Sequence, residues 1–322
     1  MSADLRPDER GAETTGHSPR RSWLFAPGSN PRVVAKALAS TADAVVLDLE
    51  DAVPLDAKEQ ARAQVAEAVA SADRPVFVRI NALSTPFAFA DVAAVVPAGA
   101  AGIVLPMTSS ATDVAVLDWL LRQHERDSPA RPQPTDGTEI MPLIETGAGI
   151  AEAPAISRAC SRVRRLAFGA ADFTVDMGME WTRDEDELLP HRSRLVLASR
   201  TAGLEPPIDS AWVDLDDSEG MDASARRARR DGFQGKLCIH PTQVAAVVRA
   251  YTPGAEAVAH AERVLAAFAE AESQGVAALR VDGKLVDYPI VEAARQTVAE
   301  AARYARLSRS GAEPETDRRD RP

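Results

Sequence analysis

Two carboxylates, Glu145 and Asp172, each follow a short apolar run that resembles a strand. Glu145 follows the run in MPLIET and Asp172 closes FGAAD, and the two runs lie about one strand–helix unit apart. In a parallel α/β fold, polar residues at the carboxyl ends of neighbouring strands converge on one pocket. A hard cation such as Mg2+ takes about six oxygen ligands and rarely more than one or two carboxylates. This spacing suggests a divalent-metal site, although each acid could instead form a salt bridge.

A second candidate is Arg79, which ends the strand-like run PVFVRIN. We expect it to point into the same pocket, where a permanent planar cation would stabilise negative charge that develops during a reaction. The acidic run LDLED supplies Asp48, Glu50 and Asp51 nearby. The alternative is an arginine clamped by Asp48 or Glu50, and both roles can hold at once. We assign Glu50 and Asp51 to orienting Arg79 or a metal-bound water.

A third candidate site follows the first apolar run, at PGSNPR. Asn30 is predicted to cap a helix whose first position is Pro31. Free backbone N–H groups at that helix start, with Arg32 and Lys36 one turn apart on one face, would suit phosphate groups. A solvated helix face has the same pattern, so both interpretations stay open.

Three further polar residues carry weaker signals. Lys58 and Arg62 in DAKEQAR are either phosphate ligands or a solvated face. His240 ends the run GKLCIH as a candidate base, but a histidine before a proline at a strand end is more often structural.

Eight short apolar runs recur along the chain, with Ala-, Arg- and Leu-rich segments of helical spacing between them. Eight buried strands, each followed by a helix, predict a (β/α)8 TIM barrel. An open doubly wound sheet is the alternative, but the GxGxxG sequence expected of its dinucleotide site is missing. The runs are 22–27, 44–49, 75–80, 102–106, 139–144, 165–169, 210–215 and 235–240, and the predicted helices include 31–40, 56–71, 111–123, 151–161, 187–203 and 219–232.

The pattern changes after the eighth run. Residues 254–274 predict a long amphipathic helix, 276–286 a hairpin that turns at Asp282–Gly283, and 288–306 another helix. A hairpin this short is marginal alone and must pack on other structure. We expect four regions in all: a disordered tail at 1–20, the barrel at 21–250, the helix–hairpin–helix appendage at 251–307, and a disordered tail at 308–322.

Composition narrows the class of protein. The chain has 322 residues, 45% apolar and 26% charged, with a net charge of −11. That charge argues against a nucleic acid or an anionic membrane as partner. No apolar run approaches the ~20 residues of a membrane span, and the N-terminus lacks the apolar centre of a signal peptide, so we expect a cytoplasmic protein. The two cysteines, Cys160 and Cys238, are too few for a disulfide framework, and structural zinc is not expected.

Nine segments in order give the chain a resemblance to a known family. It resembles the citrate lyase β-subunit-like branch of the HpcH/HpaI aldolase superfamily from about residue 21 to 306. The resemblance implies a barrel that binds Mg2+, or Mn2+ in its place, and that makes or breaks carbon–carbon bonds in acyl-CoA esters. The terminal VDGKLVD points to stand-alone malyl-CoA or citramalyl-CoA lyases. The segments are WLFAPGSNPRVVAKAL, ADAVVLDLEDAV, VRIN, IVLP, LIET, FGAADF, VDLDDSEG, GFQGKLCIHPTQV and VDGKLVD.

The resemblance also implies roles for particular residues. Glu145 and Asp172 would bind the metal, with Glu145 and Arg79 also contacting the substrate. Arg32 and Lys36 would bind CoA. In the resembling lyases the acid that matches Asp287 reaches the site from the lid of a neighbouring subunit and handles a proton at the acetyl carbon.

Asp287 has a simpler interpretation as the N-cap of the following helix. A lid donated in one direction implies a homo-oligomer, a trimer or hexamer. Two residues depart from the family pattern: Met107 stands where relatives often have Lys, and Gly147 where Ala is frequent.

The predicted reaction is a retro-Claisen cleavage of a 3-hydroxyacyl-CoA, such as citramalyl-CoA or malyl-CoA, to acetyl-CoA and a keto or oxo acid. The alternatives are a thioesterase for malyl-CoA-type esters, a CoA-independent class II pyruvate aldolase, and a non-catalytic subunit of a citrate lyase-like complex. The two departures at Met107 and Gly147 put the acyl group, more than the reaction class, in doubt.

Overall fold

The computed structural model describes residues 20–125 and 137–310. These form two compact units, one spanning Arg20–Tyr251 and the other beginning at Thr252. The tails expected at 1–20 and 308–322 lie outside the described residues, apart from Arg20 and the end of the last helix, α11 (Tyr288–Ser310).

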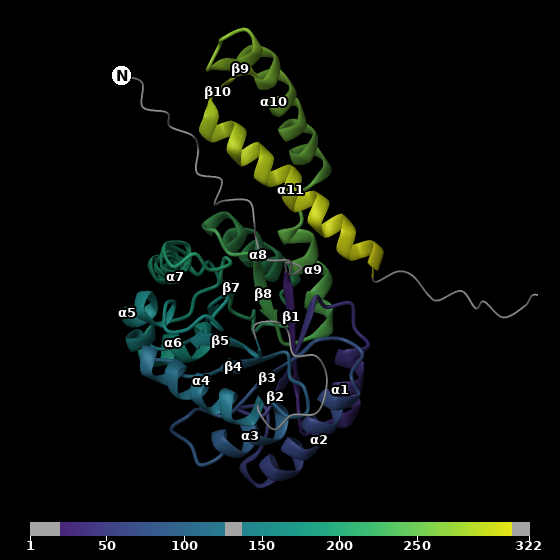
Figure 1. The fold of residues 1–322 in the computed structure, drawn as a ribbon, viewed down its shortest axis with the longest axis vertical. Helices are drawn as coiled ribbons and strands as arrows, with labels where there is room; N and C mark the ends of the chain where they lie inside the picture. The colour runs from purple at the N-terminus through teal and green to yellow at the C-terminus, as the bar shows by residue number, and fades with distance from the viewer. Residues whose placement is uncertain (1–19, 126–136, 311–322) are drawn as a thin grey trace, which may run out of the picture. The chain divides into compact units, whose positions relative to one another are not determined.

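The first unit is a closed barrel of eight parallel strands in sequential order, with helices around it (Figure 1). Pairing of β8 with β1 closes the sheet. This confirms the (β/α)8 prediction over the open doubly wound sheet, because a closed sheet leaves no edge strand. The strands are β1 (Ser22–Pro27), β2 (Ala44–Asp48), β3 (Val76–Arg79), β4 (Gly102–Leu105), β5 (Glu139–Ile144), β6 (Ala167–Phe168), β7 (Ile208–Asp209) and β8 (Gly235–Cys238).

The seventh strand was predicted wrongly, at 210–215 instead of Ile208–Asp209. Ile208 pairs with β6 and β8, but the chain then turns into a loop. In the run that reads as a strand, Trp212 is buried, whereas Val213 is 55% exposed. Trp212 packs at the start of α8 (Ser218–Asp231), where a Cβ at Gly220 would lie 2.5 Å from its ring. The apolar run therefore reflects a buried loop tryptophan and not a buried strand.

Strand side chains divide into two layers, because residues two apart on a strand point to the same side. Inside the barrel, Trp23 and Phe77 meet edge to face with ring centroids 4.8 Å apart. A Cβ at Gly102 would lie 2.3 Å from the Phe77 ring, so a glycine is needed there for the ring to fill the interior. The interior cluster is Trp23, Ala44, Val46, Phe77, Val104, Met141, Leu143, Ala167, Ile208 and Leu237.

The same alternation places three charged residues at the open end of the barrel. Asp48 follows Val46 by two positions, Arg79 follows Phe77, and Glu145 follows Leu143. All three therefore continue the inward-facing rows to the carboxyl ends of the strands. We call these strand ends and the loops that follow them the barrel mouth.

The helices cover the outer face of the strands. Most agree with the predicted ranges. Helices α3, α6 and α9, for which no range was predicted, follow β3, β6 and β8 as the strand–helix pattern requires. The helices of this unit are α1 (Pro31–Leu38), α2 (Lys58–Ser71), α3 (Ala88–Val95), α4 (Ala111–Glu125), α5 (Gly147–Ile156), α6 (Ala170–Asp176), α7 (Leu189–Thr201), α8 and α9 (Pro241–Tyr251), with 3-10 turns η2 (Leu55–Ala57) and η3 (Asp186–Leu188).

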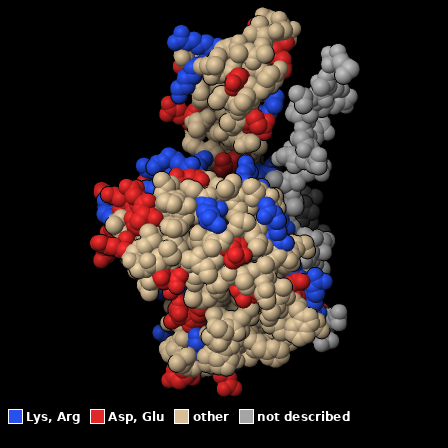
Figure 2. Space-filling model, turned by 90° about the vertical axis from the view of Figure 1, so that its left-hand side faces the viewer, with Lys and Arg blue, Asp and Glu red and all other residues tan. Residues whose placement is uncertain are grey.

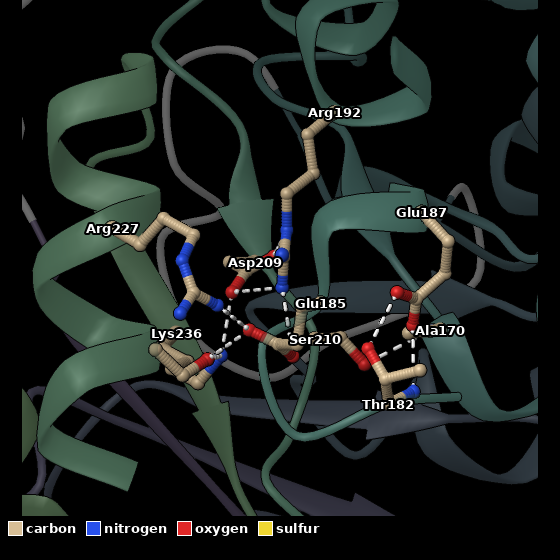
Figure 3. A network of polar contacts seen from close by, with 10 residues as sticks. Ala170, Thr182, Glu185, Glu187, Arg192, Asp209, Ser210, Arg227 and Lys236 are labelled. Carbon is tan, nitrogen blue, oxygen red and sulfur yellow. Dashed lines mark hydrogen bonds and ion pairs between the residues drawn. The ribbon is translucent and has the colours of Figure 1, made fainter. Parts of the chain in front are cut away.

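A buried ionic network joins β7 and β8 to α7 and α8 (Figure 3). Asp209 accepts hydrogen bonds from Arg192 Nε at 2.8 Å and from Lys236 Nζ at 2.5 Å, and all three side chains are 0% exposed. Glu185, also 0% exposed, accepts from Arg192 at 3.1 Å and from Arg227 at 3.1 Å. Charges buried this deeply persist only when paired, so this network belongs to the packing between barrel and helices.

The second unit is a helix, a hairpin and a helix: α10 (Ala255–Ser273), β9 (Leu279–Val281), β10 (Lys284–Val286) and α11. The hairpin turns at Asp282 (φ 48°) and Gly283 (φ 82°), as predicted. Positive φ at both central positions is the signature of the two-residue hairpin turn that Asp-Gly favours. The hydrophobic core of the second unit consists of Ala261, Val264, Phe268, Val286, Val291 and Ala294.

Surface charge is dispersed on the face drawn in Figure 2. There, Lys and Arg side chains form several small groups next to Asp and Glu, and no single basic area spreads over that face. In the part of the chain that the structure describes, no helix is long and apolar enough to cross a membrane.

Candidate active site at the barrel mouth

Arg79 lies at the centre of the charged residues of the mouth. Its Nε donates to Asp48 Oδ1 at 2.8 Å and its Nη2 to Asp48 Oδ2 at 2.6 Å. Its Nη1 lies 2.9 Å from Glu50 and 3.6 Å from Asp51, and its guanidinium carbon is 5.3 Å from the centre of the Phe25 ring. Burial alone would lower the pKa of Arg79, but the bond to Asp48 and the negative charges around it raise that pKa. The predicted clamp on Arg79 is therefore confirmed.

Lys58 and Arg62, both on α2, are structural in this unit. Lys58 Nζ donates to the backbone oxygens of Leu49 and Glu50, each at 2.7 Å, and the side chain is buried. Arg62 Nε donates to Asp91 at 2.8 Å. Both cations are thus engaged by the protein itself, and Lys58 fixes the loop that presents Glu50.

Glu145 is buried, with 2% of its surface exposed. One carboxylate oxygen accepts a hydrogen bond from the Met107 backbone N–H at 2.6 Å. A Cβ at Gly169 would lie 2.4 Å from the other oxygen, so the glycine leaves room for the carboxylate. Burial raises the pKa of Glu145 to about 8, and the charges of Glu50 and Asp172 add to this shift. Burial also raises the pKa of Glu50 to about 8, despite its ion pair.

Asp172 lies in the first turn of α6, and not at the end of a strand as predicted. Its side chain is exposed, and none of the described residues forms a hydrogen bond or ion pair with it. Its charge nevertheless raises the pKa of Glu50 and of Glu145, which brings these carboxylates into one electrostatic environment.

The donor set of the mouth fits a hard divalent cation. Glu145 and Asp172 offer carboxylate oxygens, and neither has an ion-pair partner among the described residues. No group of three or more His, Cys, Asp or Glu side chains with metal-binding geometry occurs in the described ranges. Two carboxylates are what Mg2+ commonly takes from a protein, with its remaining positions filled by water and substrate oxygens.

The first helix begins as predicted. Asn30 caps α1, accepting a hydrogen bond from Val33 N–H at 3.3 Å, and Pro31 occupies the first position. Arg32 and Lys36 are exposed, and neither forms an ion pair within the described part of the chain. They remain available to a ligand, which leaves the phosphate prediction untested.

Two other predicted residues cap helices. His240 Nδ1 lies 2.8 Å from Thr242 Oγ1 and 3.3 Å from the Thr242 backbone nitrogen, at the start of α9. Asp287 Oδ1 lies 3.4 Å from Ile290 N at the start of α11. The N-cap interpretation of Asp287 is thus confirmed, the contacts of His240 agree with its structural interpretation, and the proposed proton transfer by Asp287 stays a prediction.

Some residues that shape the mouth were not predicted. Asn81 donates to the Leu49 backbone oxygen at 2.9 Å and to Asp91 at 2.6 Å, which ties β3 to the loop after β2. Asp176 accepts a hydrogen bond from Gly147 N–H at 2.7 Å and thereby ties α6 to the start of α5. Inward alternation from the barrel interior would have found Asn81, two residues beyond Arg79, but nothing in the sequence points to Asp176.

Comparisons with known proteins agree on the family. The model of the HpcH/HpaI aldolase/citrate lyase family matches residues 21–241. An L-malyl-CoA/β-methylmalyl-CoA lyase of Cereibacter sphaeroides is 37% identical over 88% of this chain and 95% of its own. A citrate lyase subunit β of Leuconostoc mesenteroides subsp. cremoris is 35% identical over 87% of this chain and 92% of its own.

A solved structure is similar as well. The protein CitE of Mycobacterium tuberculosis, in complex with magnesium, acetoacetate and coenzyme A, superposes with a TM-score of 0.72 at 31% identity. The similarity covers 88% of this chain and 98% of that one. The resemblance that the sequence motifs indicate is confirmed.

Proposed function

The chain belongs to the HpcH/HpaI aldolase/citrate lyase family, and from that membership we propose that it is a lyase that breaks a carbon–carbon bond in a 3-hydroxyacyl-CoA. Substrates of this kind are citramalyl-CoA and malyl-CoA, which give acetyl-CoA and pyruvate or glyoxylate. One observation carries the proposal: Arg79 is held at the barrel mouth among carboxylates whose charge it does not balance. Perturbed carboxyl groups around a fixed cation are typical of a catalytic site.

We assign Glu145 and Asp172 as ligands of Mg2+, with Mn2+ as a substitute. When bound, the ion would supply positive charge and coordination positions for the carboxylate and hydroxyl oxygens of the substrate. The Met107 N–H fixes one oxygen of Glu145, which leaves its other oxygen available to the ion.

Arg79 would act on the thioester. As the carbon–carbon bond breaks, negative charge develops on the thioester oxygen, and a planar cation held in place stabilises it without reorganising. Asp48 holds the guanidinium by two hydrogen bonds, so its plane is fixed before substrate arrives. Glu50 and Asp51 would complete this orientation from the other nitrogen.

The CoA moiety would bind through its phosphates at α1. Arg32 and Lys36 are exposed there beside the helix start, where backbone N–H groups and the helix dipole favour anions. The position of α1 directly after β1 brings this helix start to the same end of the barrel as Arg79.

Asp287 would return a proton to the acetyl carbon from a neighbouring subunit, in a cytoplasmic homo-oligomer that is a trimer or hexamer. Donation in one direction must close into a ring. If Glu145→Ala and Asp287→Ala variants are each inactive, mixed oligomers formed by subunit exchange should regain part of the activity. Verified mixed oligomers without any recovery would mean that Asp287 acts in its own chain or not at all.

The decisive experiment follows acetyl-CoA, free thiol and keto acid separately with malyl-, citramalyl- and citryl-CoA in the presence of Mg2+. A lyase releases keto acid and acetyl-CoA in equal amounts, whereas a thioesterase releases free thiol without keto acid. Absence of keto acid from all three esters, with folded protein, would refute the lyase.

A further inference from the structure

Two methionines lie close to the segment that carries Glu145. Met107 is 44% exposed in the loop after β4, and its backbone N–H donates to Glu145 at 2.6 Å. Met177 is 45% exposed at the end of α6. A Cβ at Gly147 would lie 2.6 Å from the Met177 sulfur, so the Met177 side chain occupies the space above Gly147.

Met107 is held in an unfavourable backbone conformation. Its φ is 51°, in the left-handed region that residues with a Cβ seldom adopt. The conformation is maintained by the N–H bond to Glu145 and by the Ser109 hydroxyl, which donates to the Met107 carbonyl oxygen at 3.0 Å. Strain that neighbouring contacts maintain is concentrated at functional sites, and here it fixes a residue whose backbone N–H binds the Glu145 carboxylate.

No lysine or arginine among the described residues forms a hydrogen bond with Met107, Met177 or Gly147. Arg79, which pairs with the acids of the mouth, is assigned to the thioester oxygen in the proposed reaction. Asp176, in contrast, adds another carboxylate next to Gly147. An additional negative group on the substrate would therefore meet thioethers and carboxylates.

We propose that Met107 and Met177 form an apolar wall of the substrate pocket that selects a methyl group over a carboxymethyl group on the hydroxyl-bearing carbon of the acyl chain. The inference rests on the proposed lyase function and narrows its substrate class. A methyl group gains from burial against the thioethers, whereas a carboxylate would lose its hydration without a partner.

Three esters differ at that carbon alone: malyl-CoA carries hydrogen, citramalyl-CoA methyl and citryl-CoA carboxymethyl. We expect kcat/KM for citramalyl-CoA to exceed that for citryl-CoA by at least about 10-fold, because one buried group typically discriminates by that factor or more. Met107→Lys should lower this ratio by about 10-fold, since it places a cation where the second carboxylate arrives.

Three further variants locate the effect. Met177→Ala should weaken the preference for methyl, and so should Gly147→Ala, which must displace the flexible end of Met177. Leu197→Lys is the matched control, because Leu197 is 63% exposed on α7 and it adds the same charge away from the mouth. An equal ratio in wild type and Met107→Lys, or a wild-type preference for citryl-CoA, would overturn the wall.

A binding measurement separates this inference from the lyase proposal. Calorimetry with Mg2+ should show tighter binding of pyruvate than of oxaloacetate in the wild type, and the reverse order in Met107→Lys. If no ester is cleaved but pyruvate and oxaloacetate bind in this order of affinity, the proposed apolar wall is supported and the lyase proposal fails. If esters are cleaved and the order is absent in binding and in kcat/KM, the wall fails and the lyase stands.

Discussion

The barrel unit contains two clusters of buried charge that differ in how completely their charges are paired. In the network between β7, β8, α7 and α8, the Asp209 carboxylate accepts from two buried cations, which overcome the effect of burial and lower its pKa. At the mouth, Glu145 is buried nearly as deeply, yet among the described residues it accepts a hydrogen bond from one backbone N–H, and its pKa rises to about 8. The two carboxylates are therefore buried to a similar degree, but only Asp209 has cations that compensate for its burial.

This difference indicates which cluster serves the fold and which serves a ligand. A buried carboxylate with its cations satisfied needs nothing further, and its loss exposes an unpaired partner. A buried carboxylate without a cation lowers the stability of the fold unless a ligand supplies positive charge. Proteins keep such destabilising residues mainly at functional sites. The comparison predicts that mutations will affect stability in one cluster and activity in the other.

The largest effect is expected from removing the metal or its ligand. Glu145→Ala should lower kcat/KM by more than about 10²-fold, because even residues behind a metal ligand cost up to that factor. EDTA should abolish turnover in the wild type, and Mg2+ or Mn2+ should restore it. In the absence of metal, the melting temperature of Glu145→Ala should equal or exceed that of the wild type, since the variant loses a buried acid that has no cation partner. Full turnover of this variant in chelator would contradict the assignment.

The converse test breaks the buried network. Asp209→Asn should lower the free energy of unfolding by about 3–5 kcal/mol, because it leaves Lys236 buried without a carboxylate and Arg192 with Glu185 alone. Activity per folded molecule should change little. Arg226→Met is the matched control: it removes an ion pair of a side chain that is 61% exposed, which is worth at most about 1 kcal/mol. Denaturant unfolding of both variants measures the two losses in free energy of unfolding. An Asp209→Asn variant that is stable but inactive would contradict the prediction and link this network to catalysis.

A third test addresses Arg79, the cation that pairs with Asp48, Glu50 and Asp51. Arg79→Lys keeps the charge but loses the planar group that binds Asp48 through two nitrogens. We expect kcat to fall by about 10²-fold with a smaller change in KM for the CoA ester. A variant with unchanged kcat and a raised KM would show that Arg79 only binds substrate.

The comparison also shows what the sequence could and could not predict. Seven of the eight strand ranges and the Asp282–Gly283 turn were predicted well, because they depend on local periodicity and backbone preference. The convergence of Arg79 and Glu145 followed from the position of each at a strand end. The sequence could not predict which way charged helix side chains such as Lys58 and Arg62 point, because their direction depends on the residues that pack against them.

Two other misses have related causes. Asp209 and Lys236 lie on outward-facing strand positions, where an apolar residue is expected, and their pairing depends on Arg192 from a helix that packs later. Asp172 was predicted to lie at the end of a strand because an apolar run precedes it, but β6 ends at Phe168 and Asp172 lies in α6, which begins at Ala170. Short elements of this kind are decided by packing more than by propensity.

The pH dependence of stability tests the difference in compensation most directly. Glu145 and Glu50 have raised pKa values of about 8 in the folded protein. Their stabilising protons are fully present below the unfolded pKa of about 4.3 and are lost as pH rises through about 8. Without metal, stability should therefore decline from pH 5 to pH 8, by at most about 1.4 kcal/mol per pH unit for each group.

Asp209, whose pKa is lowered, contributes stability that is lost only when pH falls below its unfolded pKa of about 3.9, so it adds no slope in this range. Glu145→Gln, measured in EDTA by denaturant unfolding, should flatten the decline, and Mg2+ should flatten it in the wild type because the ion favours the ionised carboxylates. Parallel curves for wild type and Glu145→Gln would show that Glu145 is not the uncompensated acid that distinguishes the mouth from the network.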